Sequence, residues 1–190
     1  MNKIITLFKR DMANAGRITK EYALPEEYVK AAQIYATEKL DGTNVRLTVR
    51  SHTLVRVEKR NNPTKEQKSN GIIEPWYIDA KSTEPSDRWL MEAAQNTDLS
   101  TIDDGEWSGE ALGPKIQGNP LNLESHRVVL FSCDGVPIFD NVPLSYDALK
   151  EWLPKQKSKY GNNCGIEGIV WHDPAQEFSP VFKIKTKDFT

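Results

Sequence analysis

The chain has 190 residues, 38% of them hydrophobic and 27% charged, and its formal net charge is −2 at pH 7. This composition is typical of a globular protein, and the length suits one domain with its own core. No apolar run reaches the ~20 residues of a membrane span, and the N-terminus lacks a signal peptide, so we expect a cytoplasmic protein. The net charge excludes a uniformly basic, nucleic-acid-coating surface but not a local basic groove. Cys133 and Cys164 lie far apart in the sequence, which predicts free thiols.

The expected elements, in chain order, are dominated by strands. A strand over 4–8 is followed by a helix that begins at Pro25, with Glu26 and Glu27 in its first turn, where the helix dipole favours acids. Hydrophobic patterns predict strands at 34–36, 45–50, 54–58, 127–131, 166–171 and 181–185, helices at 86–95 (capped by Ser86) and 145–153 (capped by Ser145), and loops at 60–63 and 65–70. The excess of strands predicts an α+β fold with antiparallel sheets flanked by helices.

The segment Thr37–Asn44 lies between two of these strands and reads Thr-Glu-Lys-Leu-Asp-Gly-Thr-Asn. Asp41-Gly42 is a turn signal, so we expect a hairpin that holds Lys39 where one strand ends. This position is poor for core packing and good for presenting an amine to a ligand. Taken alone, the motif fits a surface hairpin with a solvated lysine equally well.

Other charged residues follow in an order that suggests a site. Arg60 is expected at the end of a strand, and Glu110 and Glu167 lie in or beside apolar strands, where a carboxylate needs a partner. Lys183 and Lys185 alternate with apolar residues on the last strand and therefore share one face. Two like charges on one face repel unless an anion lies between them. Each position alone fits an ordinary edge or surface residue, but their joint occurrence favours a binding site for an anionic ligand.

The positions resemble the adenylyltransferase domain of the RNA ligase 2-type family, in the covalent nucleotidyltransferase superfamily, over nearly the whole chain. The matching segments are Lys39–Asn44, Arg60, Gly109–Gln117, Leu130–Asp134, Glu167–Val170 and Lys183–Lys185. Asn44 stands where DNA ligases and capping enzymes usually carry arginine, which favours RNA ligases. Cys133 stands where the family usually has an aromatic residue, which leaves Phe131 as the candidate for stacking on adenine. A second alignment would match Gly105-Glu106, in place of Gly109-Glu110, to the family's third motif. The Gly-Pro-x-Ile-Gln sequence that begins at Gly113 favours Glu110.

The resemblance implies a nucleotidyltransferase (ATP-grasp-like) ligase fold in a single domain of residues 1–190, with ATP and Mg²⁺ or Mn²⁺ as cofactors. Lys39 would take AMP from ATP and pass it to an RNA 5′-phosphate, and a 3′-hydroxyl would then displace it. The implied catalytic residues are Lys39, Lys183 and Lys185, and the implied nucleotide-binding residues are Glu38, Asn44, Arg60, Glu110, Phe131 and Glu167. In this assignment Glu38 lines the adenine pocket, Glu110 holds the ribose, and Arg60 contacts a phosphate or a sugar of the incoming strand. Asn44 and Glu167 orient metal-bound waters, so no residue is a direct metal ligand.

The implied partners are RNA ends, and we expect a monomer. The sequence stops soon after Lys185, so we expect no C-terminal oligonucleotide-binding domain, and a partner protein would then supply RNA clamping. The rival interpretations are a DNA ligase, a GTP-using capping enzyme, and a non-catalytic module that binds nucleic-acid ends. His52, His126 and His172 show no metal-binding spacing and are expected at the surface.

Overall fold

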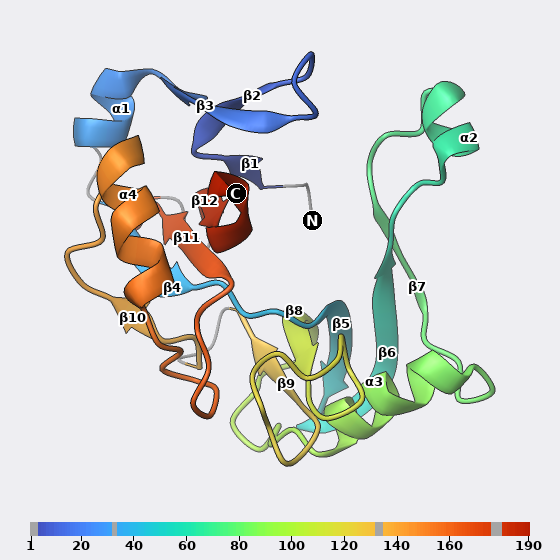
Figure 1. Cartoon of the computed structure of the whole chain (residues 1–190). Helices are drawn as coiled ribbons and strands as arrows, with labels where there is room; N and C mark the ends of the chain where they lie inside the picture. Colours follow the sequence, from blue (N-terminus) through green and yellow to red (C-terminus); the bar gives the residue numbers. More distant parts are fainter. Residues whose placement is uncertain (1–3, 32–33, 132–134, 176–179) are drawn as a thin grey trace. The chain divides into compact units, whose positions relative to one another are not determined.

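A computed structural model describes residues 4–31, 34–131, 135–175 and 180–190 (Figure 1). The chain forms two compact units: unit 1 comprises Asp41–Gly135, and unit 2 comprises Ile4–Leu40 together with Val136–Thr190. Each unit has its own sheet and its own hydrophobic core. The expected mixture of helices with antiparallel sheets is confirmed, with one parallel strand pair in unit 2. No helix in the described ranges is long and apolar enough to cross a membrane.

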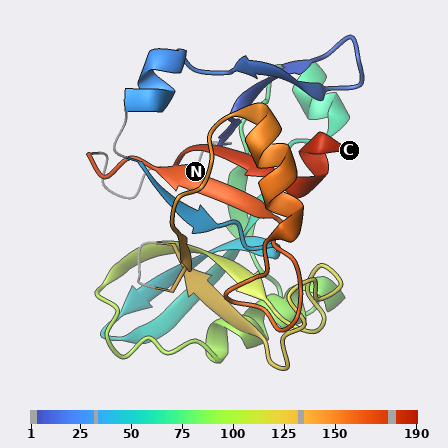
Figure 2. The same cartoon turned by 60° about the vertical axis from the view of Figure 1, so that its left-hand side comes forward.

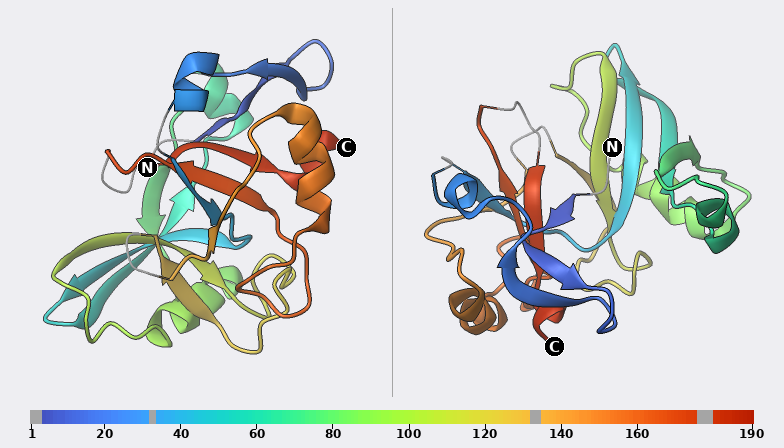
Figure 3. Two further views of the ribbon diagram at one scale, coloured as in Figure 1. Left: turned by 90° about the vertical axis from the view of Figure 1, so that its left-hand side faces the viewer. Right: turned by 90° about the horizontal axis from the view of Figure 1, so that it is seen from above.

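Unit 1 is a five-stranded sheet with one long helix on one face (Figure 3). Its elements are β5 (Thr43–Arg50), β6 (Thr53–Asn61), α2 (Lys65–Ser69), β7 (Trp76–Asp79), α3 (Pro85–Gln95), β8 (Gly105–Leu112) and β9 (Arg127–Leu130), and the strand order is β7-β6-β5-β8-β9. Side chains alternate along a strand, so Val45, Leu47 and Val49 of β5 all point into the core with Leu90 of α3. The residues between them, beginning with Asn44, lie on the face away from α3.

Asp87 joins α3 to the sheet. Its side chain is 1% exposed and accepts hydrogen bonds from Lys59 Nζ of β6 at 2.7 Å and from the Lys81 backbone N–H at 3.0 Å. Burial alone would raise the pKa of Asp87, but these hydrogen bonds hold the pKa below its ordinary value of 3.8. The charged form of Asp87 therefore stabilises the folded state.

We expect Asp87→Asn to lower the free energy of unfolding at pH 7 by about 1–3 kcal/mol, because a buried charge-assisted pair loses one partner. A folded-state pKa below 3.8 means that this stabilisation is present above that pH and is lost as the pH falls through the folded-state value. Urea unfolding measured between pH 7 and pH 3 should therefore show that the free energy of unfolding falls less with acid in the variant than in the wild type. Asp79→Asn, at an exposed carboxylate paired with Arg56, is the control and should lower stability much less than Asp87→Asn does, because solvent screens an exposed pair. Equal losses in both variants would contradict this assignment.

Unit 2 is built on a second five-stranded sheet. Its elements are β1 (Ile5–Thr6), β2 (Phe8–Asp11), β3 (Arg17–Tyr22), α1 (Glu26–Ala31), β4 (Tyr35–Glu38), β10 (Ile138–Phe139), α4 (Tyr146–Trp152), the 3₁₀ helix η1 (Leu153–Lys155), β11 (Gly168–His172), β12 (Pro180–Lys185) and η2 (Thr186–Phe189). The strand order is β1-β12-β11-β4-β10, and β2 pairs with β3 separately. Trp171 and Phe182 lie on the face that packs against α4, which Figure 2 shows across β11 and β12. The opposite face carries polar and charged side chains.

The expected hairpin around Lys39 is wrong. β4 pairs with β10 and β11 in unit 2, whereas β5 pairs with β6 and β8 in unit 1. The segment from Lys39 to Gly42 is thus a connection between two sheets. Gly42 has no left-handed φ, but a Cβ at this position would lie 2.2 Å from the backbone oxygen of Ala111. A glycine is required here because the backbone approaches β8 closely. In the sequence, a glycine required for close approach looks the same as a glycine required for a turn.

Three smaller expectations are also corrected. Residues 65–70 are not a loop, because Lys65–Ser69 form α2, which begins at a capping box between Thr64 and Gln67. The strand expected over 4–8 is interrupted at Leu7, which divides it into β1 and β2. α3 begins at Pro85 with Glu84 in the cap position, so Ser86 lies inside the helix.

Candidate functional site

Three of the expected site residues meet on the polar face of unit 2. Lys39 directly follows β4, Glu167 directly precedes β11, and Lys185 ends β12. Because β11 lies between β4 and β12, the pairing of these strands brings the three side chains together. Glu167 Oε2 lies 2.5 Å from Lys39 Nζ, and Glu167 Oε1 lies 2.5 Å from Lys185 Nζ. One carboxylate between two ammonium groups leaves the cluster with an excess of one positive charge.

The backbone fixes this cluster from both sides. The Lys39 N–H donates to the Gly168 carbonyl at 2.9 Å, and the Thr186 N–H donates to the Glu167 carbonyl at 2.8 Å. Gly168 is packed so tightly that a Cβ there would lie 2.0 Å from the Ile184 carbonyl oxygen. The side chains of Lys39, Glu167 and Lys185 are 18%, 10% and 25% exposed, so the cluster is mostly buried yet open to a ligand.

Lys183 lies on the same face of β12 as Lys185, as the alternation in the sequence predicts. It pairs with Val170 of β11, which in turn pairs with Thr37 of β4. Lys183 is half-buried and lies two residues before Lys185 of the cluster. The face therefore carries three lysines and one carboxylate.

Glu38 has a different environment from its neighbour Lys39. It is 1% exposed, and its carboxylate accepts hydrogen bonds from Ser158 Oγ at 2.5 Å and from the Lys159 N–H at 2.9 Å. Both oxygens are thus engaged within unit 2, where they attach the loop after η1 to the end of β4. A role for Glu38 in lining an adenine pocket stays a prediction.

Asn44 and Glu110 are direct cross-strand partners in unit 1, on the face away from α3. The Asn44 amide donates to the Gly109 carbonyl at 3.3 Å and accepts from the Tyr77 hydroxyl at 2.7 Å. Glu110 Oε1 accepts a hydrogen bond from the Gly42 N–H at 3.2 Å, which holds the start of β5 against β8. Tyr77 was not anticipated, although Trp76-Tyr77-Ile78 has the composition of a strand.

Arg60 lies near the end of β6, as expected, beside Tyr77 of β7. Its Nε is buried and has no hydrogen-bond partner within the described residues. A buried donor without a partner is costly, so this guanidinium fits an anionic group such as a phosphate. Phe131 directly follows β9 and is held by its backbone N–H, which donates to the Ser108 carbonyl at 3.0 Å. Residues 132–134 of the same motif, including Cys133, lie outside the described residues.

The expectation of surface histidines is wrong for two of the three. His126 is 5% exposed, stacks on Trp89 and pairs with Glu92. His172 ends β11 on the polar face of unit 2, and burial lowers its pKa to about 4. His172 contacts Tyr35 and Thr37, which no motif in the sequence had indicated.

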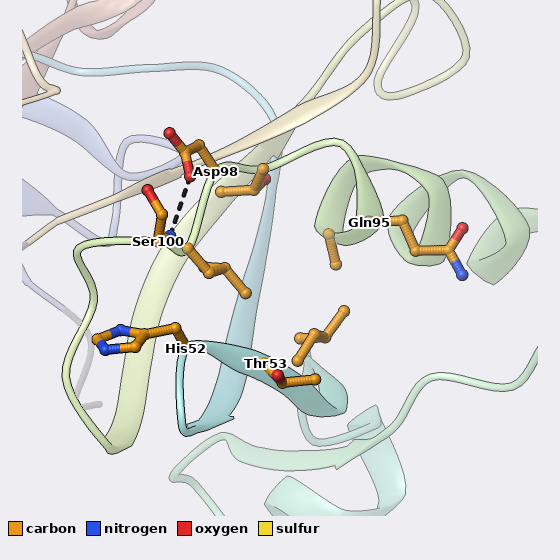
Figure 4. Close-up of a pocket in the computed structure, with 9 residues that line it drawn as sticks. His52, Thr53, Gln95, Asp98 and Ser100 are labelled. Carbon is orange, nitrogen blue, oxygen red and sulfur yellow. Dashed lines mark hydrogen bonds between the residues drawn. The ribbon is translucent and has the colours of Figure 1, made fainter.

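Figure 4 shows a separate hollow in unit 1 of about 610 Å³, between the β5–β6 turn and the C-terminal end of α3. Its labelled lining residues are His52, Thr53, Gln95, Asp98 and Ser100, and none of the candidate site residues lines it. Asp98 accepts a hydrogen bond from the Ser100 N–H at 2.9 Å, which orders the wall of the hollow. The candidate site residues therefore lie elsewhere, and all of them except Glu38 are on or beside the two polar sheet faces.

Comparison with solved structures shows that the fold is similar to that of RNA ligases. A Naegleria gruberi RNA ligase mutant with ATP and Mn is similar with a TM-score of 0.52 and 18% identity, over 86% of this chain and 52% of that chain. A second mutant with AMP and Mn has a TM-score of 0.50 and 18% identity, over 98% of this chain and 57% of that chain. A third mutant with ATP and Mn has a TM-score of 0.50 and 16% identity, over 100% of this chain and 63% of that chain. The chain thus spans between 52% and 63% of their lengths. No protein-family model and no curated protein sequence matches it.

Proposed function

We propose that the chain is an ATP-dependent RNA ligase that works through a lysyl-AMP intermediate. The observation that carries this proposal is the cluster in which Glu167 bridges Lys39 and Lys185. A partly exposed lysine at a strand end, with the ion-paired Glu167 and Lys185 beside it and Lys183 on the same face, suits a nucleophile that attacks a phosphate. A nucleotidyltransferase (ATP-grasp-like) ligase fold is part of this proposal and would agree with this chemistry.

In the proposed reaction, Lys39 loses its ammonium proton to solvent and attacks the α-phosphate of ATP as a neutral amine. A P–N bond forms, the nitrogen releases a second proton to solvent, and pyrophosphate leaves with the electron pair of the broken P–O bond. An RNA 5′-phosphate oxygen then displaces the lysine, whose nitrogen takes a proton from solvent as the P–N bond breaks, and the RNA takes the AMP. Finally, a 3′-hydroxyl attacks that 5′-phosphate and releases its proton to solvent, AMP leaves with the electron pair of the broken P–O bond, and the phosphodiester is formed. Lys183 and Lys185 would stabilise the negative charge that develops on the phosphate oxygens.

The residues of each unit, taken by itself, suit an anionic group such as a phosphate. In unit 1, Arg60 offers a buried Nε that has no hydrogen-bond partner within the described residues. In unit 2, the lysines of the Lys39 cluster outnumber its carboxylate. No group of three or more His, Cys, Asp or Glu side chains in the described ranges could hold a metal ion directly. A single carboxylate oxygen, as on Glu167 in unit 2, or a single amide oxygen, as on Asn44 in unit 1, suits Mg²⁺ or Mn²⁺ that keeps its waters. The metal would supply charge neutralisation at the phosphates. By resemblance, Glu38 and Phe131 would contact adenine and Glu110 the ribose.

The test is intact-mass measurement of the purified chain after incubation with ATP and Mg²⁺ or Mn²⁺. We expect one added AMP per chain, which an RNA with a 5′-phosphate should discharge. GTP in place of ATP tests the capping-enzyme interpretation, and a DNA end in place of RNA tests the DNA ligase interpretation. An unchanged mass with every nucleotide would refute the proposal and favour a non-catalytic module.

Lys185→Ala should slow formation of the adduct by about 10²–10³-fold, because a preorganised cation at the developing charge is lost. The fold should persist, since Glu167 still pairs with Lys39 and the Lys185 side chain is partly exposed. Single-turnover labelling with ATP gives the rate, and circular dichroism gives the fold. Lys187→Ala, at an exposed lysine of η2, is the matched control and should label at the wild-type rate. Equal rates in the two variants would show that Lys185 takes no part in the step.

A further inference from the structure

Tyr35 and His172 form an aromatic stack on the polar face of unit 2. They are direct cross-strand partners on β4 and β11, and their ring centroids lie 4.9 Å apart with an interplanar angle of 14°. His172 is the inner ring, and its Nε2 lies 2.8 Å from Thr37 Oγ1, which fixes the ring plane. Tyr35 is the outer ring and is 36% exposed. An aromatic ring is thus held in place from behind and presented outward.

The stack is electrically neutral at physiological pH. Burial lowers the pKa of His172 to about 4, so its imidazole carries no charge near pH 7. A cross-strand aromatic pair stabilises a sheet by itself, but that role does not require one ring to face the solvent. A preorganised, exposed aromatic face is the usual surface on which proteins stack unpaired bases.

The stack lies next to the lysines of the same face. Lys183 of β12 pairs with Val170 of β11, and His172 lies two residues after Val170 on the same face of β11. Lys183 and His172 are therefore diagonal neighbours, whose Cα atoms lie roughly 7–8 Å apart. Tyr35 precedes Lys39 by four residues, or about 13 Å along β4. An exposed ring on the same sheet face as several lysines matches a polynucleotide, which has bases to stack and phosphates to attract.

We propose that the outer face of Tyr35, supported by His172, is a stacking subsite for one unpaired base of the RNA near the end being joined. The proposal rests on the proposed ligase function and specifies its substrate, an end with at least one base free to leave a duplex. It is separate from the base of the nucleotide loaded on Lys39, for which Phe131 is the stacking candidate.

The test uses 5′-phosphorylated RNA with 2-aminopurine placed at successive positions from the end, without ATP. Binding of the wild-type chain should quench the fluorescence at one position, and Tyr35→Leu should abolish that quenching and weaken binding by about ten- to hundredfold. Tyr35→Phe keeps the ring and should retain both. An abasic nucleotide at the quenched position should weaken wild-type binding by the same factor and leave Tyr35→Leu unaffected. The dependence of affinity on salt should not change in Tyr35→Leu, because no phosphate contact is removed.

Two results would overturn this inference. Unchanged quenching and affinity in Tyr35→Leu would show that no base stacks there. A fall in the rate of AMP loading without RNA, with RNA binding intact, would assign the ring to the loaded nucleotide instead. Failure of the ligase proposal is seen separately, as absence of the AMP adduct in the wild-type chain, because the quenching experiment needs no ATP.

Discussion

Replacement of Lys39 by arginine is expected to eliminate the AMP adduct while leaving the fold intact. Arginine keeps the positive charge and can still pair with Glu167, so the carboxylate keeps both of its cationic partners. A guanidinium is not deprotonated in proteins, so it cannot supply the neutral nucleophile that attack on ATP requires. Lys39→Ala should likewise give no adduct, and its Glu167 carboxylate would keep Lys185 as its one cationic partner.

Intact-mass measurement with ATP and a divalent cation tests this expectation, and peptide mapping of the wild-type adduct should place AMP on Lys39. Lys30→Ala, at an exposed lysine of α1 that pairs with Glu26, is the control and should load as the wild type does. An adduct that persists in Lys39→Arg would mean that another side chain is the nucleophile.

Gly168→Ala is expected to damage both stability and loading. The added Cβ would lie 2.0 Å from the Ile184 carbonyl oxygen and 2.8 Å from Lys185 Cα, so β11 and β12 must separate where the cluster is held. Such overpacking costs about 1–3 kcal/mol. Since Glu167 and Lys185 flank the strained contact, their displacement by even ~1 Å should slow AMP loading by about 10²-fold.

The measurements are the free energy of unfolding in urea and the rate of single-turnover loading, at a temperature where the variant is folded. Gly165→Ala is the matched control: its Cβ would meet only the Gln156 carbonyl oxygen, at 3.7 Å, and its φ is not left-handed. The control should resemble the wild type in both measurements. If Gly168→Ala also did so, the close packing of β11 on β12 would not be what positions the cluster.

Local patterns determined several parts of this protein. The alternation along β12 correctly predicted that Lys183 and Lys185 share a face, because side-chain direction in a strand depends on the backbone repeat alone. Pro25 and the acids after it likewise predicted α1. The capping box of α2 was also local, and Thr64 and Gln67 could have revealed that helix.

Tertiary structure decided what the motif residues contact. Nothing near Lys39 in the sequence indicates that β4 joins one sheet and β5 another, since the choice of strand partner depends on packing between distant segments. The sequence likewise does not indicate that Glu167 bridges lysines from two other strands. It also does not indicate that Gly42 serves close approach to β8, because Asp41-Gly42 has the sequence of a turn.

The burial of His172 shows the same division. Burial lowers its pKa, and its ring contacts Tyr35 and Thr37, which are far away in the chain and become its neighbours only when β11 pairs with β4. The sequence alone therefore determined that Lys183 and Lys185 lie on one strand face, through the two-residue repeat of the extended backbone. Only the pairing of β4, β11 and β12 decided that Glu167 bridges Lys39 and Lys185, because those contacts form between segments that no local interaction brings together.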